Sequence, residues 1–95
     1  MTINRTNSLG MQYILHTAVE DKTKTVIKLV HPGEHAKVFM VPYSLEDINQ
    51  AWYNWQMRGW KIQQAFHFMS PDEREFLLTG LLPSEWEELW KGTDE

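Results

Sequence analysis

The change in hydrophobic period at Ser44 constrains the fold more than any other feature of this sequence. Before Ser44, segments rich in β-branched and aromatic residues are separated by polar turns; after it, apolar residues recur every three to four positions. The first pattern is typical of β-strands and the second of amphipathic helices. Strands followed by helices favour an α+β fold, with the helices packed on one face of a small sheet.

The strand-like segments are residues 11–19, 24–30 and 36–41. Residues 20–23 form a polar connection of hairpin length between the first two, and Pro32-Gly33 is a strong turn signal before the third. Because short connections favour neighbouring strands, we expect a three-stranded antiparallel meander over residues 11–43. Residues 1–10 are polar and end in glycine, which predicts a flexible arm.

Residues 44–92 form the predicted helical part, with three short helices packed on one face of the sheet. Ser44 is a candidate N-cap for the first helix, whose predicted core stripe is Leu45, Ile48, Trp52 and Trp55. Ser70, followed by Pro71 and Glu73, gives a clear helix start with a capping box. Pro83 opens the last helix, and residues 93–95 form a loose tail; residues 60–69 fit either a short helix or an extended connector.

Length and composition indicate a single globular domain. The chain has 95 residues, of which 42% are hydrophobic and five are tryptophan, so few side chains can complete a small core. There is no cysteine, which excludes disulfides and thiolate metal sites. No apolar run resembles a signal peptide or a membrane span, so we expect a soluble cytoplasmic protein that does not bind membranes.

The negative charge is concentrated at the C-terminal end. Residues 71–95 carry eight acidic and two basic side chains, a net charge of −6, within a chain of net charge −4. Residues 72–91 have the outline of a helix-turn-helix, but duplex DNA carries a negative charge about every 1.7 Å and would repel this segment. We therefore expect no binding to duplex DNA.

The helical segment also carries a recognisable pattern. Residues 62–90 read IQQAFHFMSPDEREFLLTGLLPSEWEELW. They resemble a C-terminal segment of small phage and prophage-type proteins, with the pattern IQxAFxxLxxxEREFLxTGxxPxxW. This chain departs from the pattern at Met69, where Leu is usual, at Leu82, where a capping Thr is usual, and at His67, which replaces a frequent Pro. The resemblance implies a phage origin and assigns no chemistry.

Two surfaces are candidates for binding a partner. The acidic side chains Asp72, Glu75, Glu85, Glu87 and Glu88 could occupy the basic nucleic-acid channel of a host protein as a charge mimic. The second stripe of the first helix, Tyr53, Met57 and Trp60, is either core or an interface, since Trp and Tyr dominate interface hot spots. The sequence therefore favours a non-enzymatic protein-binding module: a phage-derived inhibitor or modulator of a host protein, such as an anti-CRISPR-like anti-defence factor.

Two other interpretations remain open. Single-stranded nucleic acid could stack on Tyr13, Phe39, Trp52, Trp55 and Trp60 and contact nearby lysines. A small virion or scaffold protein, or a homodimer, would use an apolar sheet face left uncovered by the helices. The sequence shows no nucleophile or phosphate-loop motif, and the pair His31 and His35 alone is too few ligands for zinc, so we expect no enzyme activity, no metal and no cofactor.

Overall fold

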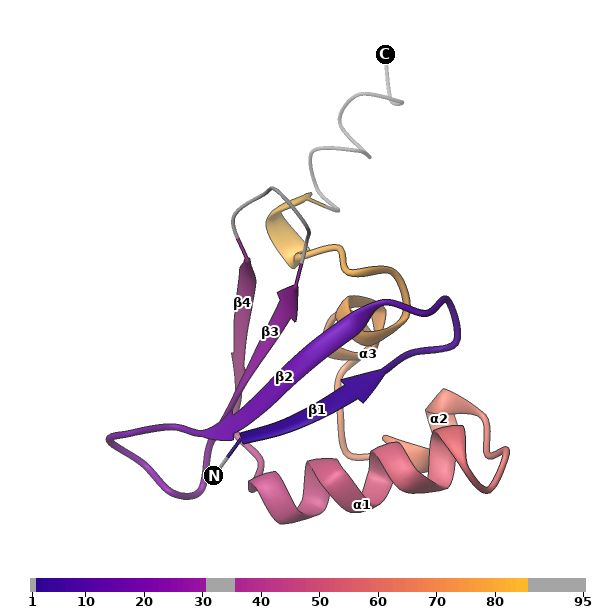
Figure 1. Ribbon diagram of the computed structural model, residues 1–95, viewed down its shortest axis with the longest axis horizontal. Coiled ribbons are helices and arrows are strands. Elements are labelled where there is room, and N and C mark those ends of the chain that lie inside the picture. The colour runs from indigo at the N-terminus through magenta and orange to yellow at the C-terminus, as the bar shows by residue number, and fades with distance from the viewer. Residues whose placement is uncertain (1, 31–35, 86–95) are drawn as a thin grey trace.

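The computed structural model describes residues 2–30 and 36–85 and contains a four-stranded antiparallel sheet (Figure 1). The strands are β1 (Thr2–Thr6), β2 (Gln12–Thr17), β3 (Thr25–Val30) and β4 (Lys37–Val41). They lie in sequence order, β1-β2-β3-β4, so each strand pairs with its neighbours in the chain. The predicted α+β class and antiparallel meander are confirmed, but the sheet has four strands where the sequence predicts three.

The additional strand, β1, lies within residues 1–10, and the prediction of a flexible arm there is wrong. The side-chain oxygen of Asn7 accepts hydrogen bonds from two backbone N–H groups of the following turn, at 2.8 and 3.0 Å, and Gly10 adopts a φ of 81°. This turn returns the chain along β2. Ile3 is the only apolar residue of β1 and packs against the core, so the strand is too polar to be recognised from its composition.

The helices are α1 (Leu45–Gln56), α2 (Ile62–Ala65) and α3 (Pro71–Thr79), and a further helical turn occupies residues 83–85. This is one helical element more than predicted, because the ambiguous segment 60–69 contains α2. Both predicted caps form: the Ser44 hydroxyl accepts from the N–H of Asp47 at 3.2 Å, and Ser70 and Glu73 close a capping box. The rest of the predicted last helix and the tail lie outside the described residues.

The hydrophobic core lies between these helices and one face of the sheet. Its largest fully buried side chains include Tyr13, Leu15, Ile27 and Leu29 from the strands and Ile48, Trp52, Phe66, Phe76 and Leu77 from the helical part. The Trp52 ring packs edge to face against those of Tyr13, Trp55 and Phe66, with centroids 5.3 to 6.0 Å apart. Such pairs contribute about 0.5–1.5 kcal/mol each beyond the burial of their area.

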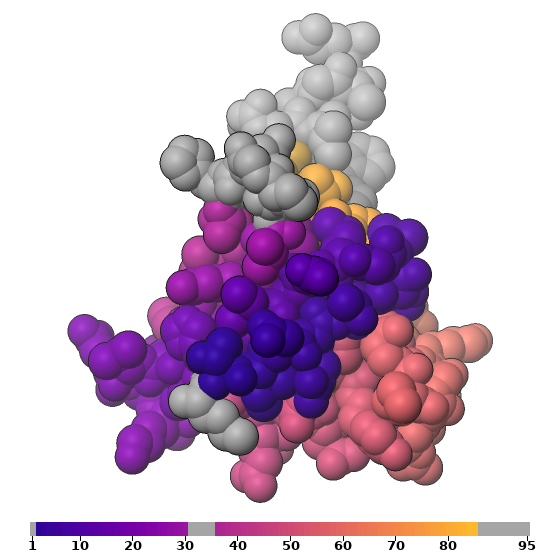
Figure 2. All heavy atoms as spheres, in the orientation of Figure 1, coloured from indigo at the N-terminus to yellow at the C-terminus, as the bar shows by residue number. Residues whose placement is uncertain are grey.

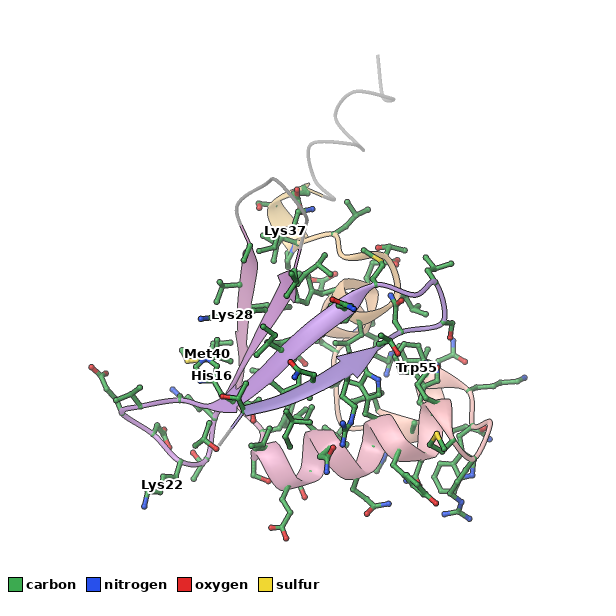
Figure 3. All side chains as sticks on the ribbon, viewed as in Figure 1. His16, Lys22, Lys28, Lys37, Met40 and Trp55 are labelled. Atoms are coloured by element: carbon green, nitrogen blue, oxygen red, sulfur yellow. The ribbon has the colours of Figure 1, made fainter. Side chains whose placement is uncertain are left out.

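No helix covers the opposite face of the sheet in the part of the chain that the structure describes. The strand register places Ile14, His16, Val26, Lys28, Val30, Val38 and Met40 on this outer face. Figure 3 shows His16, Lys28 and Met40 on the side of the sheet away from Trp55 of α1. The expectation of an apolar sheet face left uncovered by the helices therefore holds for the described residues.

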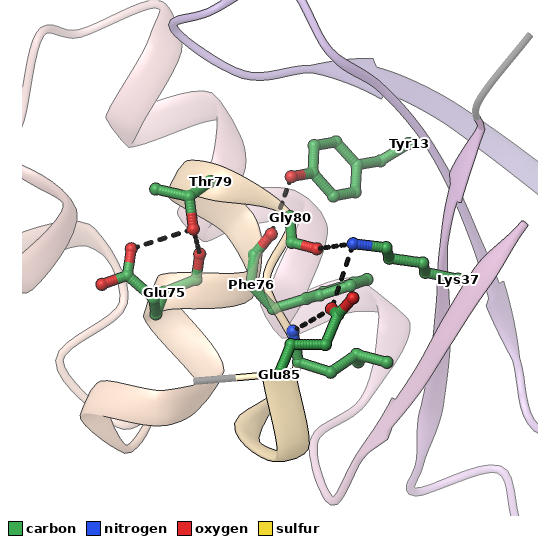
Figure 4. Close-up of polar contacts among 8 residues, drawn as sticks. Tyr13, Lys37, Glu75, Phe76, Thr79, Gly80 and Glu85 are labelled. Atoms are coloured by element: carbon green, nitrogen blue, oxygen red, sulfur yellow. Dashed lines mark hydrogen bonds and ion pairs between the residues drawn. The ribbon is translucent and has the colours of Figure 1, made fainter. Parts of the chain in front are cut away.

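Two buried side chains join the β1–β2 hairpin to the C-terminal end of α3. The side-chain amide of Asn7, a residue that is 5% exposed, donates to the carbonyls of Leu77 and Leu78 at 2.9 and 3.1 Å. The hydroxyl of Tyr13 donates to the carbonyl of Phe76 at 2.7 Å (Figure 4). The last carbonyls of a helix lack donors within it, so the bonds from Asn7 satisfy two groups that burial would otherwise leave without a helical partner. Tyr13 adds a second donor to the Phe76 carbonyl, which also accepts from the N–H that caps the helix.

Gly80 allows this end of α3 to approach the sheet closely. Its φ is 76°, and its N–H donates to the Phe76 carbonyl at 3.0 Å. A Cβ at this position would lie 2.5 Å from a methyl carbon of Leu29 on β3. Both the backbone conformation and the available space therefore require glycine.

Replacing Asn7 should destabilise the whole domain. In Asn7→Ala the carbonyl of Leu78 loses its side-chain donor, the carbonyl of Leu77 keeps only the Tyr13 hydroxyl, and the turn loses its acceptor, so we expect a loss of about 2–4 kcal/mol in the free energy of unfolding. Urea unfolding monitored by tryptophan fluorescence measures it. Asn4→Ala, at an exposed position of β1, is the matched control and should change stability by less than about 0.5 kcal/mol. Equal stability of the two variants would contradict the structural role of Asn7.

The Tyr13 hydroxyl should make stability fall at high pH. Burial raises the pKa of Tyr13 well above its usual range, although its hydrogen bond with Asn7 lowers it slightly. The folded state thus keeps the phenol protonated. The contribution of the phenol to the free energy of unfolding is complete below about pH 10, and above that pH it falls by up to about 1.4 kcal/mol per pH unit. Tyr13→Phe should be less stable than wild type by about 1–2 kcal/mol at pH 8. The difference should shrink towards pH 11; a constant difference would show that Tyr13 does not titrate in this way.

Candidate protein-interaction surface

The outward face of α1 carries an exposed apolar surface. Tyr53 and Met57 lie on the side of α1 opposite its buried stripe, and Trp60 follows the helix; we call these three residues the α1 stripe. Their exposed fractions are 52%, 73% and 38%. The sequence left open whether this stripe is core or an interface. The structure leaves it exposed, so it does not belong to the core.

A groove of about 930 Å³ lies beside the stripe, between α1 and the first strand. Its lining includes Asn4, Arg5, Asn49, Gln50, Tyr53 and Met57. Arg5 joins the two walls, because its guanidinium donates to the Asn49 side-chain oxygen at 2.6 Å and to the Asn4 carbonyl at 2.8 Å. The indole N–H of Trp52 donates to the Thr6 carbonyl at 2.8 Å. These bonds fix α1 beside β1, and Figure 2 shows the indigo residues of the N-terminal strand at the surface.

A second, smaller hollow of about 500 Å³ lies on the other side of α1 and includes Trp60 in its lining. The Arg58 guanidinium lies 4.8 Å from the centroid of the Trp60 ring, which is a cation–π geometry. Tyr43 also lines this hollow, and its hydroxyl donates to the Glu73 carboxylate at 2.8 Å. Partial burial, and then this carboxylate, raise the pKa of Tyr43. The stripe therefore lies between two hollows that hold ordered polar groups.

The predicted acidic surface is only partly assembled in the described residues. Asp72 is exposed at the start of α3. Glu75 is half-buried and accepts a hydrogen bond from the Thr79 hydroxyl at 3.1 Å. Glu85 forms an ion pair with Lys37 at 3.0 Å and accepts from the Leu82 N–H at 2.8 Å (Figure 4). Glu87 and Glu88 lie outside the described residues, as do His31 and His35.

The contact between Glu85 and Leu82 explains how the last helix begins without a capping threonine. Leu82 has no side-chain oxygen to accept from the helix, but Glu85 still provides the other half of a capping box by accepting the N–H of Leu82. Glu85 is therefore part of the local structure, and its pairing with Lys37 anchors this turn to β4. Of the proposed acidic set, Asp72 remains the most available for a partner among the described residues.

The surface required for stacking single-stranded nucleic acid is not present in the described residues. Tyr13, Trp52 and Trp55 are buried, and the Phe39 ring packs edge to face against Phe76 at 5.5 Å. Trp60 alone of the five proposed aromatic residues is exposed. Two of the nearby lysines are also paired: Lys37 with Glu85 at 3.0 Å, and Lys24 with Asp21 at 3.9 Å.

Comparison with protein-family models, with curated proteins and with solved structures found no significant match. None of the helices in the described part of the chain is long and apolar enough to cross a membrane. Within residues 2–30 and 36–85, no group of three or more His, Asp or Glu side chains is arranged to hold a metal ion. The surface on and beside α1 is thus the candidate site that the geometry defines.

The sequence pattern indicates the stripe but not the groove, because the groove needs β1. The signal that could have revealed β1 was the segment 7–10, Asn-Ser-Leu-Gly, which combines an Asx-turn residue with a glycine immediately before a predicted strand. Recognising that turn would have placed Arg5 on an edge strand. Its partner Asn49 follows from no sequence pattern.

The α1 stripe should be replaceable without loss of stability. We expect the free energy of unfolding of the double variant Tyr53→Ser/Met57→Ser to lie within about 0.5–1 kcal/mol of the wild-type value, because both side chains are largely in solvent. Trp55→Ala, from the buried face of the same helix, should lose about 3–5 kcal/mol. Thermal and urea unfolding of the two variants measure the contrast. A loss of several kcal/mol in the Tyr53/Met57 variant would show that the stripe is part of the core.

Proposed function

We propose that this chain is a non-enzymatic protein-binding module whose partner contacts the α1 stripe. The observation that carries the proposal is the exposed set Tyr53, Met57 and Trp60. These side chains lie between two hollows, on and just after a helix whose other face is buried in the core. Aromatic and methionine side chains are enriched at protein interfaces, and exposed apolar surface of this kind marks interaction sites. A rigid support reduces the entropy lost on binding.

The more specific form of the proposal is a phage-derived inhibitor or modulator of a host protein, such as an anti-CRISPR-like anti-defence factor. Its support is the resemblance of residues 62–90 to a segment of small phage proteins. The net charge of −6 over residues 71–95 supports a partner with a basic nucleic-acid channel. In this form the stripe supplies the apolar contact and Asp72 and its acidic neighbours supply the charge complementarity.

Affinity capture from a nuclease-treated bacterial lysate tests the stripe. Tagged wild-type protein should retain a stoichiometric protein partner, and Tyr53→Ala/Met57→Ala/Trp60→Ala should lose at least about 30-fold in affinity, as expected when hot-spot side chains are removed. Leu9→Ser/Val19→Ser, which removes exposed apolar side chains elsewhere, is the matched control and should bind as wild type does. Equal capture by the triple variant would reject the stripe as the binding surface.

Salt separates the contributions of the stripe and the acidic side chains. At about 1 M salt the Debye length falls to about 3 Å, so binding through the acidic side chains should be released while apolar contact persists. Charge reversal at Asp72, Glu87 and Glu88 tests the same point without disturbing the pair between Glu85 and Lys37. If the partner binds equally well at high salt and after charge reversal, the charge-mimic form of the proposal is contradicted.

A further inference from the structure

The two edges of the sheet differ in how their backbone groups are satisfied. The N–H of Asn7 donates to the carbonyl of Met11, so Asn7 and Met11 form a hydrogen-bonded pair, and the alternation of an antiparallel ladder then points the polar groups of Asn4 and Thr6 away from β2. Side chains satisfy two of the outward carbonyls of β1: Arg5 donates to Asn4 and Trp52 donates to Thr6. The β1 edge is therefore blunted against further strands.

The β4 edge has no such protection among the described residues. The N–H of Ala18 donates to the carbonyl of Lys24, so these two residues form a hydrogen-bonded pair. The backbone groups of the even-numbered residues of β3 therefore point towards β2, and those of its odd-numbered residues point towards β4. The backbone groups of Val38 and Met40 consequently point outward. Within residues 2–30 and 36–85, no hydrogen bond reaches them. Their side chains are also 51% and 52% exposed, so this edge is both apolar and unpaired.

We propose that β4 pairs with β4 of a second copy of the chain, joining the two sheets in one continuous antiparallel sheet. The edge is self-complementary about a two-fold axis through Phe39 and perpendicular to the sheet. In that register Val38 of one copy faces Met40 of the other, and the two residues exchange both backbone hydrogen bonds. The same symmetry places Lys37 opposite Val41, so no like charges meet across the strands.

The charges on the outer face are compatible with this pairing. Lys28, on β3, is separated from its counterpart in the second copy by three strand spacings, about 14 Å, which exceeds the Debye length of about 8 Å at physiological salt. Lys37 is neutralised by Glu85 within its own chain. Val26 lies next to Met40 on the same face, so pairing extends an apolar cluster across the two-fold axis. A second copy therefore covers the apolar side chains and the outward backbone groups of the β4 edge.

The α1 stripe would remain free in this dimer. β1 forms the edge of the sheet opposite β4 and is bonded to α1 through Arg5 and Asn49, so pairing through β4 would leave both stripes uncovered. The pairing is inferred from β4 alone and stands whether or not the stripe binds a partner. Because the contact is a short edge, the dimer should be reversible and dependent on concentration.

Sedimentation equilibrium of the purified full chain tests the proposal without any partner. Wild-type protein should shift from monomer to dimer with rising concentration, and Val38→Pro should weaken dimerisation at least tenfold. Proline removes an outward N–H that the ladder within the chain does not use, so the fold should persist by circular dichroism. Asn4→Pro makes the matched change at the β1 edge and should dimerise as wild type does.

A second variant keeps the test decisive if Val38→Pro does not fold. Met40→Lys, at a half-exposed position, places a charge beside the two-fold axis and should also weaken dimerisation at least tenfold. Wild-type protein that stays monomeric up to about 1 mM would overturn the proposal, since any contact would then be weaker than about 4 kcal/mol. A dimer that survives both β4 variants, or that Asn4→Pro dissolves, would also overturn it.

Discussion

The hydrogen bonds from Asn7 and Tyr13 to the last carbonyls of α3 are the contacts on which the rest of the structure depends. They join residues 63 to 70 positions apart and satisfy a helix end that lies directly on the sheet. The same Asn7 side chain shapes the turn that forms β1. Without β1 there is no groove beside α1 and no partner for Asn49, so a buried cluster outside the stripe determines the surface around it.

The α1 helix combines a structural and an exposed role. One face contributes Trp52 and Trp55 to an edge-to-face aromatic cluster, and the indole N–H of Trp52 also holds the backbone of β1. The other face carries Tyr53 and Met57 in solvent. Because the buried face fixes the helix, the exposed side chains are presented on a rigid support, and little backbone entropy remains to be lost when a partner binds.

The sequence predicted those parts of the fold that follow from local patterns. The caps at Ser44 and Ser70 and the buried stripe of α1 follow from spacing alone, and the structure confirms them. β1 was not predicted because, as a short edge strand, it needs only one apolar residue, Ile3. The pairing of β1 also depends on a turn whose key contact is with α3, which is distant in sequence. For the same reason the stripe could be identified while the groove beside it could not. Glu85 looked like a free surface charge because the sequence does not show that Lys37 lies beside it.

Photo-crosslinking in the bacterial cell tests the central claim, that the α1 stripe is the binding surface, most directly. A photoreactive phenylalanine analogue at position 53 occupies the stripe, and the same analogue at position 19 occupies an even more exposed apolar site on the β2–β3 connection. We predict that position 53 yields one defined crosslinked protein and that position 19 yields none. A crosslink to the same protein from position 19 but not from position 53 would contradict the account and place the partner on the other end of the molecule.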